Sequence, residues 1–261
     1  MSDELIVTVS PHIFKKESIP SIMWRVLLAL IPSGAVGVCI FGPKAFNVIV
    51  TAILSAVLTE GLIQKLCRRK ITIYDGSAAL TGILLAYNLP PTTPLWIVCI
   101  GSFFAIAIVK QLFGGLGKNL FNPALAARAF LLISWPRHLT SFSLPFSYDG
   151  ITSATPLVLL KEGKVSNLIQ MGLSYWDLFI GNRGGCIGEV CVFALILGAI
   201  YLLWKRIISW HIPFSFIFTV ALFSFVFGGR GGLFRGDWLF NILSGGLILG
   251  AFFMATDYET K

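Results

Sequence analysis

Long apolar stretches separated by short polar links run through most of the chain. A helix that crosses a bilayer needs about 20 mainly apolar residues, and most of these stretches come close to that length. One uncharged run, residues 76–109, is too long for a single helix, and Pro90, Pro91 and Pro94 divide it. The pattern predicts eight helical segments, of which the third and the fifth are short. They cover residues 22–41, 45–67, 75–89, 95–113, 121–135, 187–204, 212–227 and 238–256.

The composition narrows the class of protein. Hydrophobic residues make up 56% of the 261 residues and charged residues only 12%, whereas soluble domains carry about 25% charged residues. So little polar surface excludes a soluble enzyme, a disordered protein and a nucleic-acid-binding module. Because helices satisfy their own backbone hydrogen bonds in lipid, we expect an all-α, polytopic membrane protein.

The chain has a net charge of +8, and the distribution of its basic residues over the loops indicates an orientation in the membrane. Basic residues gather in cytoplasmic loops, and most of them fall on one side if the predicted helices simply alternate. This places the N-terminus in the cytoplasm and the segment around residue 150 outside, although Lys44, Arg230 and Arg235 do not obey the rule. The basic residues on the cytoplasmic side are Lys15, Lys16, Arg25, Lys65, Arg68, Arg69, Lys70, Lys110, Lys118, Lys205 and Arg206.

Four parts are expected along the chain. They are a cytoplasmic N-terminal segment (residues 1–20), a first helical repeat (21–135), an extracytoplasmic loop (136–186) and a second, incomplete repeat (187–261). Residues 80–85 resemble residues 243–248, and glycine-interrupted helices in two halves are typical of inverted repeats with a site at their interface. The alternative is that these small residues only help helices to pack. A similarity over only six positions, taken by itself, favours this alternative.

Cysteine and histidine give no sign of a metal site. The five cysteines form no CxxC pair and the three histidines have no ligand spacing. We interpret the cysteines as small hydrophobic residues and predict no bound metal.

The extracytoplasmic loop carries the most informative string, Tyr-Asp-Gly-Ile-Thr-Ser-Ala-Thr-Pro-Leu at residues 148–157. Pro156 biases Thr155 toward extended backbone, and small neighbours leave the Thr155 hydroxyl open to a bulky reagent. Asp149 could accept a proton or hold a metal. An ordinary turn rich in serine and threonine explains the same residues.

The segment from Asp149 through Thr152, Ser153 and Ala154 to Thr155 resembles the flavinylation motif D-x-x-[ST]-[GS]-A-T, in which a flavin transferase links FMN through its phosphate to the last threonine. Further strings along the chain match the same family. Together with the flavinylation motif, they make the chain resemble the D subunit of the Rnf complex, which belongs to the Rnf D and Nqr B family. The further strings follow in chain order. They are Ser10-Pro11-His12-Ile13, Asp75-Gly76-Ser77-Ala78, Thr81-Gly82, Leu89-Pro90-Pro91, Gly114-Gly115-Leu116-Gly117-Lys118-Asn119, Phe121-Asn122-Pro123-Ala124-Leu125, Gly185-x-x-Gly188-Glu189 and Gly250-Ala251-Phe252-Phe253-Met254-Ala255-Thr256-Asp257.

The resemblance implies ten helices in two inverted five-helix repeats, and this chain would end after the eighth. It implies a membrane subunit of a translocase, inactive alone, that relays electrons between ferredoxin and NAD through FMN on Thr155 and couples this to Na⁺ or H⁺ movement. The implied location is a bacterial or archaeal inner membrane, with Thr155 outside. Implied partners are the other Rnf subunits, the flavin transferase and the lipid bilayer, without nucleic acid. A second, non-covalent flavin, riboflavin, is also implied.

Further residues carry weaker predictions. Glu60 lies in an apolar helix, where an acid is an ion-path candidate; pairing with Lys65 near the interface is the alternative. Asp75 either caps the third helix or joins the ion path. Asn119 and Asn122 flank a glycine-rich turn that could bind a flavin or be a plain loop. Arg128 needs a partner inside the fifth segment and is a further cofactor-binding candidate.

Two other functions remain open. The B-type subunit of the sodium-pumping NADH:quinone oxidoreductase shares much of the pattern, but its long N-terminal extension is missing here. A non-redox channel or transporter, or a scaffold without cofactor, would fit the broken helices equally well, but neither would need the flavinylation string. No nucleotide-binding fingerprint is present, so NAD and ferredoxin are expected to bind to other subunits.

Overall fold

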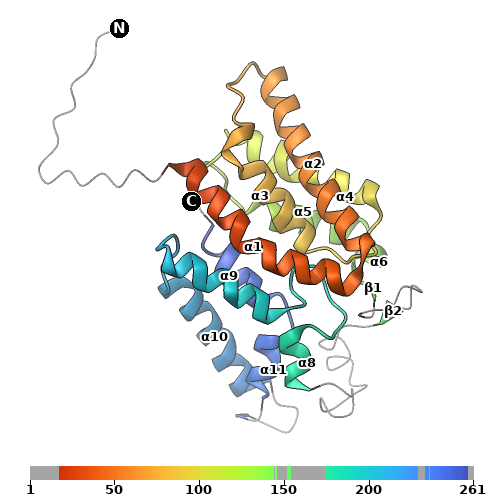
Figure 1. Ribbon diagram of the computed structural model, residues 1–261, viewed down its shortest axis with the longest axis vertical. Helices are drawn as coiled ribbons and strands as arrows, with labels where there is room; N and C mark the ends of the chain where they lie inside the picture. Colours follow the sequence, from red (N-terminus) through yellow and green to blue (C-terminus); the bar gives the residue numbers. More distant parts are fainter. Residues whose placement is uncertain are drawn as a thin grey trace, which may run out of the picture.

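Helices make up almost all of the regular structure in the computed structural model (Figure 1). The structure describes residues 18–143, 145, 152–153, 174–228, 233–234 and 236–257. A single pair of two-residue strands, β1 and β2, accompanies the helices in these residues. The elements are α1 (Ile19–Phe41), α2 (Pro43–Leu66), η1 (Ile73–Asp75), α3 (Ser77–Tyr87), α4 (Leu95–Phe103), η2 (Phe104–Gln111), α5 (Pro123–Ser134), α6 (Pro136–Leu139), β1 (Phe142–Ser143), β2 (Thr152–Ser153), α8 (Tyr175–Ile180), α9 (Val192–Trp204), α10 (His211–Phe227), α11 (Trp238–Leu243), α12 (Leu247–Leu249) and η4 (Gly250–Met254).

The first two helices form an apolar hairpin. Gly42 ends α1 with a φ of 72°, a backbone conformation that favours glycine, and Pro43 then starts α2. With 23 and 24 residues, α1 and α2 are the two helices in the described part of the chain that are long and apolar enough to cross a membrane. The other helices are shorter, so the predicted number of eight spans is not confirmed.

Every predicted segment contains a helix, but two of them change type along their length. The fourth segment is an α-helix to Phe103 and continues as the π-helix η2. The eighth segment breaks at residues 244–246 into α11, α12 and the π-helix η4, because a serine and two glycines interrupt its helical pattern.

The sixth segment begins later than predicted. Helix α9 starts at Val192, and the residues before it run along the end of α3 without helical structure. The amides of Ile187 and Gly188 donate to the carbonyl oxygens of Leu89 and Tyr87, each at 3.1 Å. These bonds satisfy polar backbone groups that a helix would otherwise pair internally.

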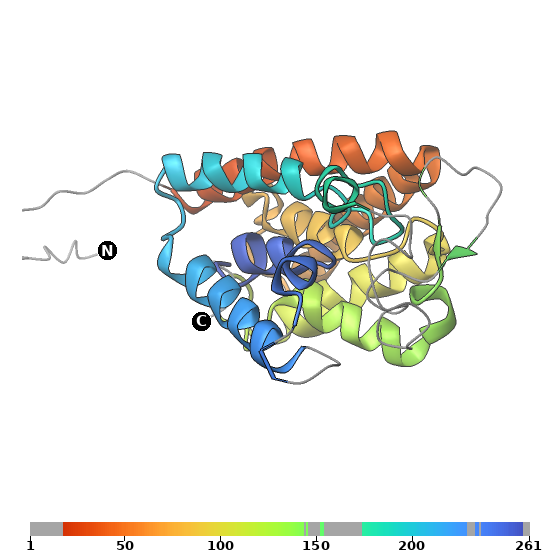
Figure 2. The same cartoon turned by 90° about the horizontal axis from the view of Figure 1, so that it is seen from below.

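The helices pack in layers around α3. Figure 1 shows α2 to α5 on one side of α1 and α9 to α11 on the other. Seen from below, α1, α2 and α9 lie along one side of the molecule, with the remaining helices beneath them (Figure 2). Helix α3 contacts α1, α2, α4 and α5, and nine of its eleven residues are buried, so it forms the centre of this packing.

Small residues allow the closest helix contacts. A Cβ atom on Gly198 of α9 would overlap the carbonyl oxygen of Ala29 on α1, and one on Gly82 of α3 would lie 2.8 Å from the carbonyl oxygen of Ala52 on α2. Contacts between small residues are typical of helix packing in membranes. Helix α10 differs, because Pro213 is its one buried residue and its phenylalanines face outward.

Replacement of Gly198 by alanine tests the contact between α1 and α9. The added methyl group would force the two helices apart, and overpacking of this kind costs about 1–3 kcal/mol. We expect a lower thermal midpoint for Gly198→Ala in the purified protein, followed by intrinsic fluorescence. Gly250→Ala is the matched control, since its Cβ meets no atom within 4 Å; equal midpoints in the two variants would contradict the prediction.

Candidate functional site

A buried ion pair lies where α2, α3 and η2 meet. Lys110 Nζ is 3.2 Å from Glu60 Oε1, and both side chains are 1% exposed. The sequence-based alternative that Glu60 pairs with Lys65 is therefore wrong. Residues five apart on a helix do not share a face, and Lys65 is exposed.

Two amide groups complete the surroundings of the Glu60 carboxylate. Gln111 Nε2 donates to Glu60 Oε1 at 2.8 Å and Gln64 Nε2 donates to the same oxygen at 3.3 Å. Gln64 is itself held by Thr72, whose amide donates to Gln64 Oε1 at 2.8 Å. Glu60 thus faces hydrogen-bond donors from three residues, Gln64, Lys110 and Gln111.

Ser77 links Lys110 to Asp75. Lys110 Nζ donates to Ser77 Oγ at 2.5 Å, and Ser77 Oγ donates to Asp75 Oδ1 at 2.6 Å. Asp75 also accepts the backbone amide of Ser77 at 2.9 Å, so it caps the start of α3 as predicted, although Gly76 occupies the N-cap position itself. Asp75 is partly exposed, whereas Ser77 is fully buried. We call Glu60, Gln64, Asp75, Ser77, Lys110 and Gln111 the Lys110 cluster.

Asn122 and Asn119 lie in a second polar region at the start of α5. Asn122 Oδ1 accepts the amides of Ala124 and Leu125 at 3.0 and 3.2 Å, and its Nδ2 donates to Asp257 Oδ2 at 2.9 Å. Asn119 is 1% exposed, yet neither atom of its side-chain amide has a hydrogen-bond partner among the residues that the structure describes. A buried amide without partners costs free energy, so Asn119 is a candidate for ligand binding.

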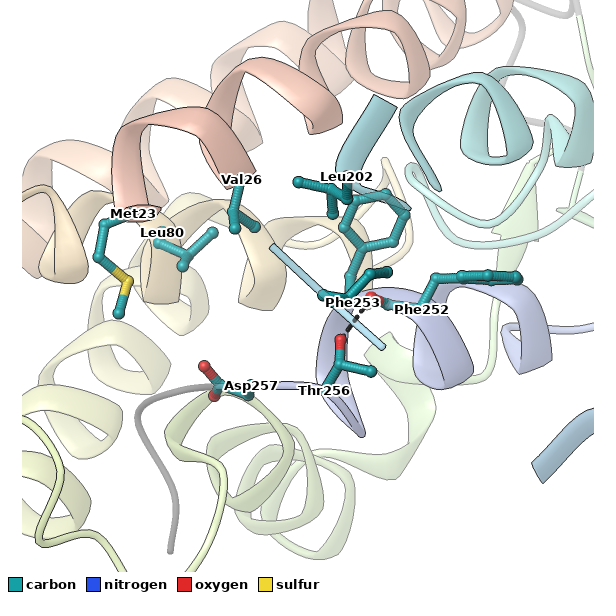
Figure 3. A pocket seen from close by; sticks show the side chains of 9 residues that line it. Met23, Val26, Leu80, Leu202, Phe252, Phe253, Thr256 and Asp257 are labelled. Carbon is teal, nitrogen blue, oxygen red and sulfur yellow. Dashed lines mark hydrogen bonds between the residues drawn. The ribbon is translucent and has the colours of Figure 1, made fainter. Parts of the chain in front are cut away.

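Two hollows lie in the same region and share Met23 as a lining residue. One of them, of about 130 Å³, is lined by Leu116 and Gly117 of the glycine-rich turn together with residues of α1. The other holds about 10 Å³, room for about one water molecule, and has mainly apolar walls with Thr256 and Asp257 at one side (Figure 3). Its lining residues are Met23, Val26, Leu80, Leu202, Ile208, Phe252, Phe253, Thr256 and Asp257.

Arg128 finds its partners at the end of α3 and before α9. Its guanidinium donates to the backbone carbonyl of Asn88, to Asn88 Oδ1 at 3.2 Å and to Cys186 Sγ at 3.5 Å. The expectation that Arg128 finds a partner is confirmed, in the form of these hydrogen bonds. Its predicted role in cofactor binding stays a prediction.

The flavinylation string is described only at its middle. Asp149, Ala154 and Thr155 lie outside the described residues, and Thr152 and Ser153 form the backbone of β2. This strand pairs antiparallel with β1, with Ser153 opposite Phe142. Thr92 Oγ1 donates to the carbonyl oxygen of Ser141 at 3.1 Å, so β1 is fixed to the turn between α3 and α4.

Lys110 is the functional candidate that the sequence analysis missed, since it was counted only as a flanking charge. The signal was present, because Lys110 falls inside the predicted segment 95–113, and an ionisable residue within a membrane segment is functional by default. No three His, Cys, Asp or Glu residues come together in the part of the chain that the structure describes.

Apolar outward faces around internally paired charges form the architecture of an integral α-helical membrane protein. Residues 6–261 match the model of the NQR2, RnfD, RnfE family. The chain belongs to this family, which confirms the resemblance found in its sequence.

Similarity to individual relatives supports the same family assignment. The chain is 50% identical over 259 residues to the D subunit of the Na(+)-translocating ferredoxin:NAD(+) oxidoreductase complex of Acetobacterium woodii, a match that covers 98% of this chain and 78% of the relative. It is 47% identical to the D subunit of the proton-translocating complex of Clostridium ljungdahlii, with 97% and 78% covered. The D subunit of an ion-translocating oxidoreductase complex of Escherichia coli is 35% identical, with 97% and 82% covered.

The buried ion pair can be tested with a double-mutant cycle. Removing one partner of a buried pair costs about 3–5 kcal/mol, whereas replacing both by apolar residues is often neutral. We expect Glu60→Leu to lower the thermal midpoint strongly and Glu60→Leu with Lys110→Met to recover most of the loss. Lys65→Met should leave the midpoint unchanged. Additive losses in the double variant would contradict a coupled pair.

Proposed function

We propose that this chain is a membrane subunit of an ion-translocating ferredoxin:NAD oxidoreductase complex and relays electrons through FMN linked to Thr155. The observation that carries the proposal is the string from Asp149 to Thr155, which matches the flavinylation motif in a member of the NQR2, RnfD, RnfE family. The names of the relatives from Acetobacterium woodii and Clostridium ljungdahlii support the assignment to such a complex.

The bound FMN would supply the redox chemistry, while the protein fixes its position and surroundings. Thr155 would hold the flavin phosphate as an ester, with Asp149, Thr152, Ser153 and Ala154 as the string that the flavin transferase reads.

Asn119 would bind the second, non-covalent flavin, riboflavin, and Asn122, whose side-chain amide already bonds to Ala124, Leu125 and Asp257, would fix the start of α5 beside it. A side-chain amide offers one acceptor and two donors, and the edge of a flavin ring presents a complementary N–H between two carbonyl oxygens. The Asn119 amide is buried and has no hydrogen-bond partner in the described part of the chain, so this donor and acceptor stay available there.

Glu60 and Asp75 would lie on the ion path. Glu60 is a buried carboxylate and Asp75 a partly exposed one, and Ser77 and Lys110 connect the two through hydrogen bonds. Relatives that are named for Na⁺ translocation and for proton translocation match the chain about equally well. The other subunits of the complex would bind NAD and ferredoxin.

The covalent flavin can be detected directly on a denaturing gel. We expect fluorescence in the band when the protein is produced with a flavin transferase, and none in the band of Thr155→Val, which lacks the hydroxyl. A dark wild-type band, beside a control protein that the same transferase has labelled, would remove the redox assignment and favour a channel or transporter.

Non-covalent flavin can be tested separately by acid extraction of the purified protein. Asn119→Ala should lose most of the extractable riboflavin, because the buried amide that recognises the ring edge is gone, and should keep its fluorescent band on the gel. Asn47→Ala, at an exposed position of α2, serves as the control. Full riboflavin content in Asn119→Ala would contradict the assignment.

A further inference from the structure

The loop after α2 carries an exposed group of basic side chains. Arg68, Arg69 and Lys70 follow the helix directly and are all exposed, and Lys65 precedes them in its last turn. We call Arg68, Arg69 and Lys70 the basic loop. Figure 1 shows the end of α2 and the chain after it projecting at the top of the molecule.

The acidic residues nearest to the basic loop in sequence are bonded to other groups. Glu60 pairs with Lys110, and Asp75 accepts the hydroxyl and the backbone amide of Ser77. No carboxylate of the described residues lies within ion-pair distance of the basic loop. A partner that carries negative charge would therefore complement it.

Hydrogen bonds hold the basic loop in one conformation. Arg68 has a φ of 53°, at a position after the helix end where glycine is usual. The amide of Arg69 donates to the carbonyl oxygen of Gln64 at 2.8 Å, and its guanidinium donates to the carbonyl oxygen of Gln111 at 3.0 Å. Gln64 Nε2 also donates to Thr72 Oγ1 at 2.8 Å. A loop that is already fixed loses little conformational entropy when it binds a ligand.

An apolar stripe on α2 leads to the basic loop. Residues four apart share one face of a helix, and four such leucines, each between 56% and 72% exposed, form what we call the leucine stripe. It spans about 18 Å at 1.5 Å per residue, close to one leaflet of a bilayer whose hydrocarbon core is about 30 Å thick. The leucines are Leu54, Leu58, Leu62 and Leu66.

Two aromatic residues indicate the depth of the basic loop in the membrane. Trp24 and Tyr74 are both exposed, and Trp24 Nε1 donates to the carbonyl oxygen of Tyr74 at 3.3 Å. Tryptophan and tyrosine gather where lipid headgroups meet water. Tyr74 follows Lys70 by four residues, so the basic loop lies at the level of the lipid phosphates.

We propose that the basic loop and the leucine stripe bind one anionic phospholipid, with its phosphate at Arg68 and Lys70 and an acyl chain along the leucines. An arginine guanidinium bonds two phosphate oxygens at once, and a lysine adds a point charge. This site involves neither the flavins nor the ion path, so it goes beyond the proposed function.

The side chains of the stripe favour lipid over a helix of another subunit. Contacts between helices in membranes are rich in small residues, as in the contacts of Gly198 with Ala29 and of Gly82 with Ala52. The leucine stripe instead presents large side chains at every fourth position. Such a surface accommodates a flexible acyl chain more readily than a closely packed helix.

The test measures the thermal midpoint of the full chain in neutral detergent as phosphatidylglycerol is added. The midpoint should rise, because a ligand that binds only the native state stabilises it. Phosphatidylcholine, which has no net charge, and inorganic phosphate, which has no acyl chain, should leave the midpoint unchanged.

Two double variants locate the site. Each basic residue near an anionic surface contributes roughly fivefold to binding, so Arg68→Gln with Lys70→Gln should need about 25-fold more phosphatidylglycerol for the half-maximal shift. Lys44→Gln with Arg137→Gln is the matched control. It removes the same charge from exposed residues at the start of α2 and in α6, away from the basic loop (Figure 1), and should respond like the wild type.

A third variant tests the leucine stripe without changing any charge. Leu58→Ala with Leu62→Ala should also require more phosphatidylglycerol, while its midpoint without lipid should stay near that of the wild type, because both side chains are exposed. An unchanged response to phosphatidylglycerol in this variant would contradict a bound acyl chain.

Three other results would overturn the proposal. They are equal shifts with phosphatidylcholine and phosphatidylglycerol, a full shift with inorganic phosphate alone, and equal responses of the two charge variants. Loss of the other subunits from the complex purified with Arg68→Gln and Lys70→Gln, together with a wild-type response to phosphatidylglycerol, would assign the basic loop to a protein partner instead.

Discussion

A charge that is removed from water must be matched by an opposite charge or by hydrogen bonds, and this constraint shapes the interior of the first five helices. Glu60 and Lys110 come from elements 50 residues apart in the chain, yet their pairing brings α2 and η2 together beside the start of α3. Gln111, Gln64 and Ser77 occupy the remaining hydrogen-bonding positions. The cluster is thus both a site of possible chemistry and a determinant of helix packing.

The same constraint applies to the backbone where helices break. The residues before α9 bond to the carbonyl oxygens at the end of α3, and the buried hydroxyl of Ser33 donates to the carbonyl oxygen of Gly188 at 2.8 Å. Gly188 is required at that point, because a Cβ atom there would overlap the Tyr87 ring. Irregular backbone at the centre of the molecule is thus held by neighbouring elements, as membrane proteins require.

Much of this organisation follows from the sequence. The hydrophobic pattern located all eight helical segments, and the Asp75–Ser77 cap and the need of Arg128 for partners were both foreseen from residue type. The two π-helices were not predicted, since their wider turns depend on contacts with other helices. The alternative that Glu60 pairs with the nearby Lys65 was wrong for the same reason, because the fold brings in a lysine from a distant element. That the Asn119 amide lacks a partner among the described residues likewise becomes visible only when its neighbours are known.

The distance in sequence between Glu60 and Lys110 also matters during synthesis. Each charged residue costs about 2.5–3.5 kcal/mol when it enters the bilayer centre in an isolated helix, and α2 leaves the ribosome before the segment with Lys110 exists. Glu60 remains without its partner until about 50 further residues have been added. The pairing of Glu60 with Lys110 therefore couples the insertion of α2 to that of the α4–η2 segment.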